Sequence, residues 1–265
     1  MTSLLDVFHD GNVIARRNVI KIKRVPEVLV FVLLSPIMFV LLFAYVFGGA
    51  VDIPGVSYRE FLIGGIFAQT VVFGATFTGA GLADDMQKGI INRFRSLPMA
   101  RSAVLVGRTA SDVIYNALSL LIMALTGLLV GWRMHNGLWK SALGFLLLLA
   151  FAYAFSWVMG YVGLLVPSVE VINNAAFMVI FPLTFVANTF VPSESLPTVL
   201  RHFAEWNPVS AVTQAARELF GNIGPGTATP TAWSLQNPVL YTIIWIVLII
   251  AVFAPLAVRR YAKMQ

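Results

Sequence analysis

The sequence has no cysteine and very little charge. Without cysteine there can be no disulfide, thiolate nucleophile or cysteine-ligated metal. Charged residues make up 11% of the 265 residues, and 58% are hydrophobic. A soluble domain carries roughly 25% charged residues. The polar surface is therefore too small to face water on all sides, and we expect an integral membrane protein.

Several catalytic motifs are also missing. A P-loop needs a lysine directly after glycine, because backbone amides and the lysine cradle phosphates, and no lysine here follows a glycine. The His-Glu-x-x-His and Gly-x-Ser-x-Gly motifs are absent as well. We expect no enzyme activity, no metal site and no cofactor bound by this chain. The net charge of +6 gathers at the ends of apolar runs, which favours membrane orientation over nucleic-acid binding.

Six apolar runs have about the length that a helix needs to cross a bilayer, roughly 20 residues. The candidate spans are Val28–Phe47, Phe61–Leu82, Ser111–Val130, Leu143–Leu165, Val171–Phe190 and Leu240–Val258. The predicted fold class is therefore all-α, with six transmembrane helices. Small residues in the second span favour close packing against another helix, without identifying which one. They are Gly64 with Ala68, Gly74 with Thr78, and Ala75 with Gly79.

Lysine and arginine are unevenly divided between the two sides of a six-span topology. Of the 18 such residues, thirteen fall on the side that holds both termini and five on the other. Cytoplasmic loops carry the excess of positive charge. Both termini are therefore expected in the cytoplasm.

The N-terminal segment, residues 1–26, precedes the first span. Leu4, Phe8, Gly11 and Ile14 recur near helical spacing, with charged residues between them. This pattern is typical of an amphipathic helix on the membrane surface. A solvated tail is the alternative.

The second cytoplasmic loop carries an apolar stripe with a basic rim. The apolar positions are Ile90, Ile91, Phe94 and Leu97, the arginines are Arg93, Arg95 and Arg101, and Pro98 ends the segment. Such a helix suits docking into a groove on another protein. The alternative is a helix resting on anionic lipid.

Charge inside the spans is scarce. Arg108, Asp112 and Asn116 are spaced by four and share one helix face at the start of the third span. They predict an intrahelical ion pair at the membrane surface, and Asp112 is also the best candidate for an ion or proton path.

The fifth loop, residues 193–220, contains two short amphipathic stretches. Leu196, Val199, Leu200 and Phe203 form the first stripe, and Val209, Val212, Ala216 and Leu219 form the second, after Asn207-Pro208. Each stretch is too short to span a bilayer. We expect either a helical hairpin that dips into the outer leaflet or caps the bundle, or an ordinary interfacial loop helix.

Two of these runs carry a family resemblance. The first run, residues 84–108, reads DDMQKGIINRFRSLPMARSAVLVGR and is followed by Asp112. The second run, residues 190–212, reads FVPSESLPTVLRHFAEWNPVSAV. Within a six-span chain, they resemble the ABC-2 type transporter permeases. The chain is most similar to the daunorubicin-resistance branch of antibiotic and lipid exporters.

The resemblance implies one permease domain over residues 1–265, with the fold of type V exporters. Residues 1–26 would form the interface helix, 84–101 the coupling loop and 193–220 the extracellular re-entrant gate helices. The implied coupling residues are Asp84, Asp85, Ile91, Arg93, Phe94, Arg95, Leu97 and Pro98, and the implied gate residues are Leu196, Leu200, Phe203, Asn207 and Pro208.

The resemblance also implies partners and a location. A separate ABC ATPase subunit would bind ATP and Mg, and a second permease copy, identical or closely related, would complete the path. The transporter would sit among the lipids of a bacterial plasma membrane and export a hydrophobic drug, antibiotic or lipid. Aromatic residues of the spans would supply an apolar permeation surface: Phe73, Phe77, Phe151, Phe155, Trp157, Phe177, Phe181 and Phe185. The alternatives are a polysaccharide or teichoic-acid permease, or a membrane scaffold without transport.

Overall fold

The computed structural model describes residues 10–18, 20, 34, 37–47, 53, 55–96, 102–166, 168–225 and 229–264. The regular structure in these residues is helical, which confirms the predicted all-α class. Four helical segments among them are long and apolar enough to cross a membrane: Tyr58–Gln87, Ala103–Val130, Gly137–Leu165 and Pro238–Lys263. Two shorter apolar helices are also present: Ile37–Val46 lies within the first predicted span, and Val169–Phe185 overlaps the fifth. Residues 28–33, 35 and 36 of the first predicted span lie outside the described residues. The chain is therefore a multi-pass membrane protein.

The first long segment consists of α3 (Tyr58–Gly74) and α4 (Thr76–Gln87), which meet at Ala75. The others are α6 (Ala103–Val130), α7 (Gly137–Leu165) and α12 (Pro238–Lys263). Each of these four segments is longer than the predicted span that it contains, because the helices continue past the point where the apolar pattern stops. The fifth predicted span, in contrast, was drawn too long: α8 (Val169–Phe185) ends before Asn188. The backbone N–H of Asn188 donates instead to the hydroxyl of Ser210, 3.1 Å away.

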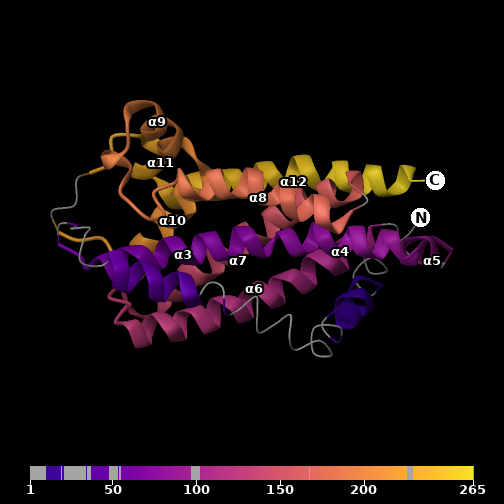
Figure 1. Ribbon diagram of the computed structural model, residues 1–265, viewed down its shortest axis with the longest axis horizontal. Helices are drawn as coiled ribbons and strands as arrows, with labels where there is room; N and C mark the ends of the chain where they lie inside the picture. The colour runs from indigo at the N-terminus through magenta and orange to yellow at the C-terminus, as the bar shows by residue number, and fades with distance from the viewer. Residues whose placement is uncertain are drawn as a thin grey trace.

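The long helices run side by side along the long axis of the molecule (Figure 1). α7 contacts α12, α4, α6 and α10 (Pro208–Phe220). The short elements η2 (Ser193–Ser195), α9 (Thr198–Trp206) and α11 (Trp233–Gln236) cover one end of this bundle. α5 (Ile90–Ser96), residues 10–18 and the C-terminal end of α12 lie at the opposite end. We call these the α9 end and the α5 end.

Capping residues fix where several helices begin. Ser57 accepts a hydrogen bond from the backbone N–H of Glu60 at the start of α3, and Ser168 does the same for Val171 in α8. Asn207 accepts from Val209 N–H, and Pro208 follows as the first residue of α10, a position where its missing N–H costs nothing.

Glycines let α4 and α7 touch backbone to backbone. A Cβ atom on Gly163 would lie 2.6 Å from the carbonyl oxygen of Gly79, and one on Gly79 would lie 2.7 Å from that of Met159. Such approaches leave no room for a larger side chain. The small-residue spacing predicted a close approach, and the structure identifies α7 as the partner of Gly79.

The α9 end holds an aromatic cluster. Trp132 and Phe220 meet edge to face with centroids 5.3 Å apart, and both contact Phe67 of α3. The indole N–H of Trp132 donates to Asn222 at 2.7 Å. This cluster anchors the C-terminal end of α10 inside the bundle. Exposed aliphatic side chains gather instead on the outer faces of α6 and α12, where lipid would contact them.

Candidate functional site

The predicted coupling segment divides into two helices at the α5 end. Asp84 and Asp85 belong to the last turn of α4, and the chain then turns at Lys88 and Gly89 before α5 begins at Ile90. Gly89 has φ +65°, a left-handed conformation that glycine adopts without strain. Within its described part, the coupling segment thus consists of the end of α4, a turn and α5. Leu97, Pro98 and Arg101, together with the side chain of Arg95, fall outside what the structure describes.

Arg17 connects three elements at this end. Its Nη2 donates to Oδ1 of Asp85 at 2.9 Å, and its guanidinium carbon lies 5.1 Å from the ring centroid of Phe94 in α5. Asp85 is only 4% exposed, so the pair is far better shielded from solvent than a surface ion pair. Asp84 pairs with Lys88 of the turn at 2.7 Å. The basic N-terminal segment is thus tied to both parts of the coupling segment.

The helix at residues 10–18 packs across the start of α6. A Cβ atom on Gly107 would lie 2.4 Å from the carbonyl oxygen of Gly11 and 2.6 Å from Cβ of Ile14. Asn18 Nδ2 donates to the hydroxyl of Ser111 at 3.2 Å. Asn12, Val13 and Arg16 are exposed on the opposite face, and Leu4 and Phe8 of the predicted amphipathic pattern lie outside the described residues.

The predicted anchors differ in their accessibility. Ile91 is buried against Leu82, Val104 and Leu105 of this chain, so it cannot reach a partner protein. Phe94 is half-buried beside the same cluster, and Arg93 is exposed. Phe94 can therefore contact both its own bundle and a partner, and Ile90 at the start of α5 is half-buried as well.

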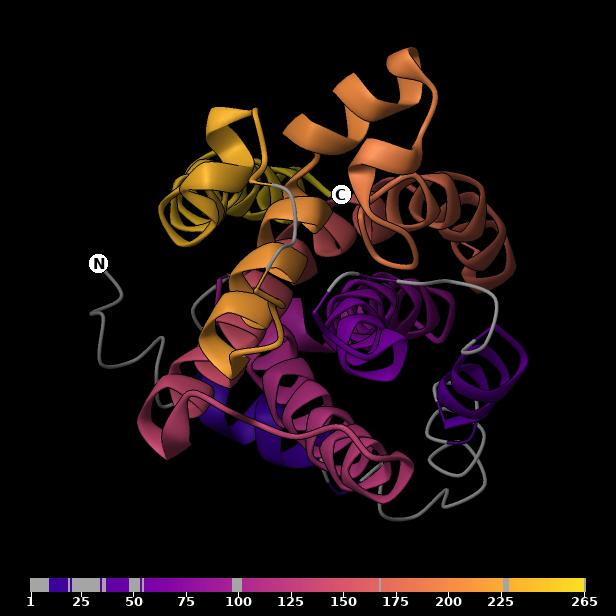
Figure 2. The same ribbon diagram turned by 90° about the vertical axis from the view of Figure 1, so that its left-hand side faces the viewer.

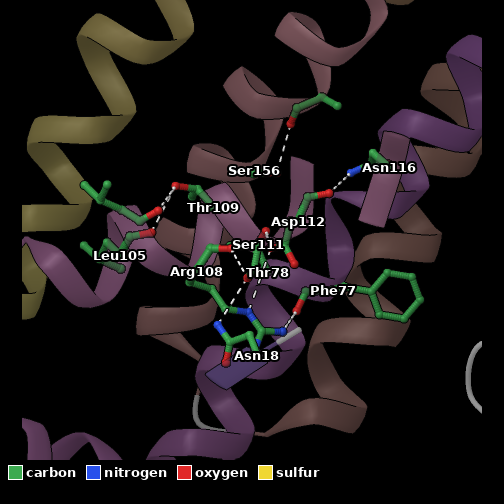
Figure 3. A network of polar contacts seen from close by, with 12 residues as sticks. Asn18, Phe77, Thr78, Leu105, Arg108, Thr109, Ser111, Asp112, Asn116 and Ser156 are labelled. Carbon is green, nitrogen blue, oxygen red and sulfur yellow. Dashed lines mark hydrogen bonds and ion pairs between the residues drawn. The ribbon is translucent and has the colours of Figure 1, made fainter. Parts of the chain in front are cut away.

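A polar network joins α4 to α6 in the interior. The hydroxyl of Thr78 donates to Asp112, and Arg108 Nε lies 3.9 Å from the same carboxylate oxygen. Arg108 Nη2 donates to the carbonyl oxygen of Phe77 at 2.7 Å, and Asn116 Nδ2 donates to the backbone carbonyl of Asp112 at 2.9 Å. Figure 3 shows these side chains converging between the two helices.

The structure corrects the expected position of this network. Arg108 and Asp112 do form an intrahelical pair, but Asp112 is buried, because α6 begins at Ala103 and continues well before Ser111. Glycines make room for it on the facing helices: a Cβ atom on Gly81 would lie 1.8 Å from Arg108 Nη2, and one on Gly74 2.1 Å from Asn116 Oδ1. The network therefore fixes how α3 and α4 lie against α6.

Arg217 is the central residue at the α9 end. It is 1% exposed and sits on α10. Its three nitrogens donate to the backbone carbonyls of Phe61 at 2.8 Å, Asn188 at 2.8 Å and Thr189 at 3.0 Å. Its guanidinium carbon also lies 3.4 Å from the ring centroid of Phe61. One side chain thus holds α10 to α3 and to the chain after α8.

The two predicted gate helices are buried to different extents. α10 enters the bundle and contacts α7, α12 and α3, and Asn207 at its start donates from Nδ2 to the carbonyl oxygen of Leu183 at 2.7 Å. α9 lies outside: Leu200 is 42% and Phe203 52% exposed, and Leu196 is half-buried. Figure 2, which looks onto the α9 end, shows the two helices of the hairpin spread across it. The gate role of these residues stays a prediction.

Glu218, at the outer end of α10, has a shifted acidity. Partial burial raises the pKa of its carboxyl to about 7, and a hydrogen bond from Gln214 opposes the shift.

Sequence reasoning missed Arg17 and Arg217 as site residues, since both entered only the count of basic residues. Arg217 follows Ala216 within the apolar stripe of the second gate stretch, and a basic residue in such a place was the available signal. Nothing in the sequence indicated that Arg17, rather than its neighbour Arg16, would bind Asp85.

Comparison with known proteins identifies the family of the chain. The model of the ABC-2 type transporter family matches residues 11–220, which run from the helix that Arg17 occupies to the end of α10. The chain belongs to the ABC-2 type transporter family. It is 32% identical over 245 residues to the daunorubicin resistance ABC transporter permease protein DrrB1 of Streptomyces coeruleorubidus, covering 92% of this chain and 83% of that protein.

More distant relatives of this ABC-2 permease have related descriptions. It is 25% identical over 188 residues to the probable doxorubicin resistance ABC transporter permease protein DrrC of Mycobacterium tuberculosis strain H37Rv, covering 71% of this chain and 64% of that one. It is 23% identical over 220 residues to the putative transport permease ycf38 of Cyanophora paradoxa, covering 79% and 73%. The resemblance seen in the two sequence runs is thereby confirmed: the chain is an ABC-2 permease that is similar to drug-resistance permeases.

Proposed function

We propose that this chain is the membrane subunit of an ATP-driven exporter that moves a hydrophobic drug, antibiotic or lipid out of the cell. The contact that carries the proposal is the bridge from Arg17 to Asp85 and Phe94. It ties the short helix α5, which crosses no membrane, to the end of a helix that does. The drug-resistance permeases among the relatives support the choice of a hydrophobic substrate.

In this proposal the membrane is crossed six times. The two shorter apolar helices, Ile37–Val46 and Val169–Phe185, complete the four long segments. Residues 10–18, α5 and the C-terminal end of α12 would face the cytoplasm of a bacterial cell. Their common position at one end of the bundle supports this orientation, as does the excess of lysine and arginine on that side.

A separate ABC ATPase would bind ATP and Mg and dock on α5, with Phe94 as the apolar contact and Arg93 at the rim. When the ATPase moves α5, the Arg17–Asp85 pair carries the displacement into α4. The α4–α3 segment ends beside Arg217, so the displacement reaches the bonds that hold α10. A second permease copy would complete the outward path.

The test is ATPase retention and ATP-dependent efflux from vesicles. Phe94→Ala should weaken binding of the co-expressed ATPase roughly thirtyfold, since truncating a central apolar contact commonly costs about 2 kcal/mol or more. Phe94→Leu keeps the bulk and should bind better than Phe94→Ala. Phe203→Ala, at the α9 end, is the matched control and should retain the ATPase fully.

Two results would contradict the proposal. Full ATPase retention and full efflux with Phe94→Ala would remove Phe94 from the contact. Unchanged retention and efflux after replacement of residues 88–96 by a Gly-Ser linker would remove the transporter mechanism itself.

A further inference from the structure

The outer face of α12 is a long aliphatic strip. α12 lies at the edge of the bundle in Figures 1 and 2, and one of its faces packs against α7 and α10. Thr242, Ile249 and Ala257 are buried on that packed side. The apolar side chains exposed elsewhere on the helix are Ile243, Ile244, Val247, Leu248, Val252 and Leu256, which we call the α12 strip. The strip offers the hydrocarbon of a membrane a continuous apolar surface.

The α12 strip ends in three positive charges. Leu256, Arg259 and Lys263 are spaced by three and four residues, so they lie on the same side of the helix. Arg259, Lys263 and the neighbouring Arg260 are all exposed. α12 contains no Asp or Glu. Among the described residues, none of the three basic side chains has an ion pair or a hydrogen bond. Their charge is therefore available to a partner outside the chain.

The length of α12 places these charges at the depth of lipid headgroups. The hydroxyl of Tyr241 donates to the carbonyl oxygen of Trp206 at 3.0 Å, and its ring meets Trp233 edge to face with centroids 6.0 Å apart. Trp206 is 51% and Trp233 44% exposed, which is typical of aromatic residues at a membrane–water interface. Arg259 follows Tyr241 by 18 residues, about 27 Å along the helix. The hydrocarbon core is roughly 30 Å thick, so Arg259 and Lys263 reach the opposite interface.

The outer face of α6 is apolar as well but ends differently. Ile114, Leu118 and Leu121 are exposed along it. Arg108, the basic residue of α6, is directed into the bundle, where its Nη2 donates to the carbonyl oxygen of Phe77 at 2.7 Å. Of these two helices, α12 is therefore the one whose own outer face carries both an apolar strip and exposed positive charge.

We propose that the α5 end of α12 binds an anionic phospholipid, with its acyl chains along the α12 strip and its phosphate on Arg259, Arg260 and Lys263. Guanidinium and ammonium groups donate strong charge-assisted hydrogen bonds to phosphate oxygens. Phosphatidylglycerol has a net negative charge, whereas phosphatidylcholine carries an ammonium group that these residues repel. The site therefore selects lipid by headgroup charge. It requires only that the chain spans a membrane and does not depend on the proposed export.

Charge and depth argue against two other occupants. A second copy seated on the α12 strip by two-fold symmetry would bring the Arg259 and Arg260 guanidinium groups of both chains together, and like charges repel. A soluble protein could reach the charged end but not the strip, which lies at the depth of the hydrocarbon. An anionic phospholipid complements both parts at once.

A lipid at this site would stabilise the α5 end of the bundle. Ala257 and Tyr261 of α12 belong to the buried cluster that also contains Leu82 of α4 and Ile91 of α5. A ligand that binds the folded arrangement and not the unfolded chain shifts the equilibrium toward the folded arrangement. Bound lipid should therefore raise the thermal stability of the permease.

The test is lipid binding to the full-length chain in neutral detergent, with bound lipids counted by native mass spectrometry. Dioleoylphosphatidylglycerol and dioleoylphosphatidylcholine have the same acyl chains and differ in headgroup charge. The wild type should bind phosphatidylglycerol at least about tenfold more tightly. Arg259→Gln/Arg260→Gln should weaken phosphatidylglycerol about twentyfold, since each juxtamembrane charge contributes roughly fivefold, and should leave phosphatidylcholine within about twofold of the wild type.

Two further variants separate local charge from folding and from net charge. Arg259→Lys/Arg260→Lys keeps the charge and should bind phosphatidylglycerol within about threefold of the wild type. Arg133→Gln/Lys140→Gln removes the same charge from exposed positions at the α9 end and should bind as the wild type does. The proposal is overturned if this control loses as much binding as Arg259→Gln/Arg260→Gln, or if the latter binds phosphatidylglycerol as tightly as the wild type.

Inorganic phosphate and a single cysteine test the other occupants. Excess inorganic phosphate should leave phosphatidylglycerol bound, because the free ion makes no contact with the α12 strip; displacement by phosphate would overturn the lipid site. Leu248 is 47% exposed, and the chain has no cysteine of its own. Leu248→Cys should therefore stay monomeric under copper–phenanthroline oxidation in nanodiscs, and efficient disulfide-linked dimerisation would assign the strip to a second copy instead.

Thermal unfolding gives an independent measurement. Phosphatidylglycerol should raise the apparent Tm of the wild type more than phosphatidylcholine does, and Arg259→Gln/Arg260→Gln should abolish that difference. Equal Tm values of the wild type in the two lipids would contradict the proposal.

Discussion

Replacing Arg217 by methionine tests whether this one side chain holds α10 in the bundle. Methionine fills a similar length but has no donor, so the carbonyl oxygens of Asn188 and Thr189 lose the N–H groups 2.8 and 3.0 Å away. Each orphaned buried carbonyl costs about 1–3 kcal/mol. Loss of the stacking on Phe61 adds about 0.5–2 kcal/mol. The substitution also removes the cost of burying a charge, which offsets part of these losses. We therefore expect the free energy of unfolding to fall by about 3 kcal/mol in total.

A loss of that size should lower the apparent Tm of the purified permease by about 6–12 °C, at about 2–4 °C per kcal/mol for a chain of this size. Fluorescence-detected size-exclusion chromatography after heating measures it. The matched control is Arg201→Met on α9, which removes a partly exposed ion pair with Glu205 and should change the Tm by no more than about 2 °C. Arg217→Lys should fall between the two, because one ammonium cannot span all three carbonyls. Equal Tm values for Arg217→Met and Arg201→Met would refute the reasoning.

Three further predictions follow from other contacts. Gly107→Leu would force the added side chain into the backbone of Gly11, so residues 10–18 should detach from α6 and become sensitive to protease, while the chain still inserts in the membrane. Unchanged resistance of residues 10–18 to protease would contradict this packing. The pKa of Glu218, raised by burial to about 7, means that its contribution to stability is present below about pH 4.5 and is lost as the pH rises through 7. Glu218→Gln should therefore be more stable than the wild type at pH 8 but not at pH 4, and parallel Tm–pH curves would reject this. In the cysteine-free chain, Asn136→Cys should react with an impermeant thiol reagent in intact cells and Ile90→Cys should not; the reverse pattern would invert the proposed topology.

The membrane architecture could be predicted from the sequence because apolar length is a strong local signal. Helix ends could not, because they depend on tertiary partners. By hydropathy Asp85 lies beyond the second predicted span, yet it is helical and buried, with Arg17 bound to its carboxylate. The reverse holds after Phe185: the predicted span continued to Phe190, but residues 186–190 leave the helix, and the backbone of Asn188 bonds with Ser210 and Arg217.

In the candidate sites, too, contacts with other helices could not be predicted from the sequence. Spacing by four identified the Arg108–Asp112 pair, since both partners are on one helix. It could not reveal that Thr78 and the carbonyl of Phe77 complete the network from α4. Arg217 was the hardest case: its partners are backbone carbonyls, which every residue possesses and which leave no mark in the sequence.

The α3–α4 segment has a mechanical consequence of its own. It spans 30 residues, from Tyr58 to Gln87, and at 1.5 Å per residue is about 45 Å long. The bond from Ala75 N–H to the carbonyl of Val71, 3.2 Å, keeps it connected across the junction. If it pivots as a rod about its middle, a tilt of about 5° moves each tip by about 2 Å in opposite directions. That travel exceeds what a 2.8 Å hydrogen bond to the carbonyl of Phe61 tolerates. A small angular change at Asp85 would therefore suffice to break the bond from Arg217 to Phe61 at the far tip, while the bonds from Arg217 to Asn188 and Thr189 stay in place.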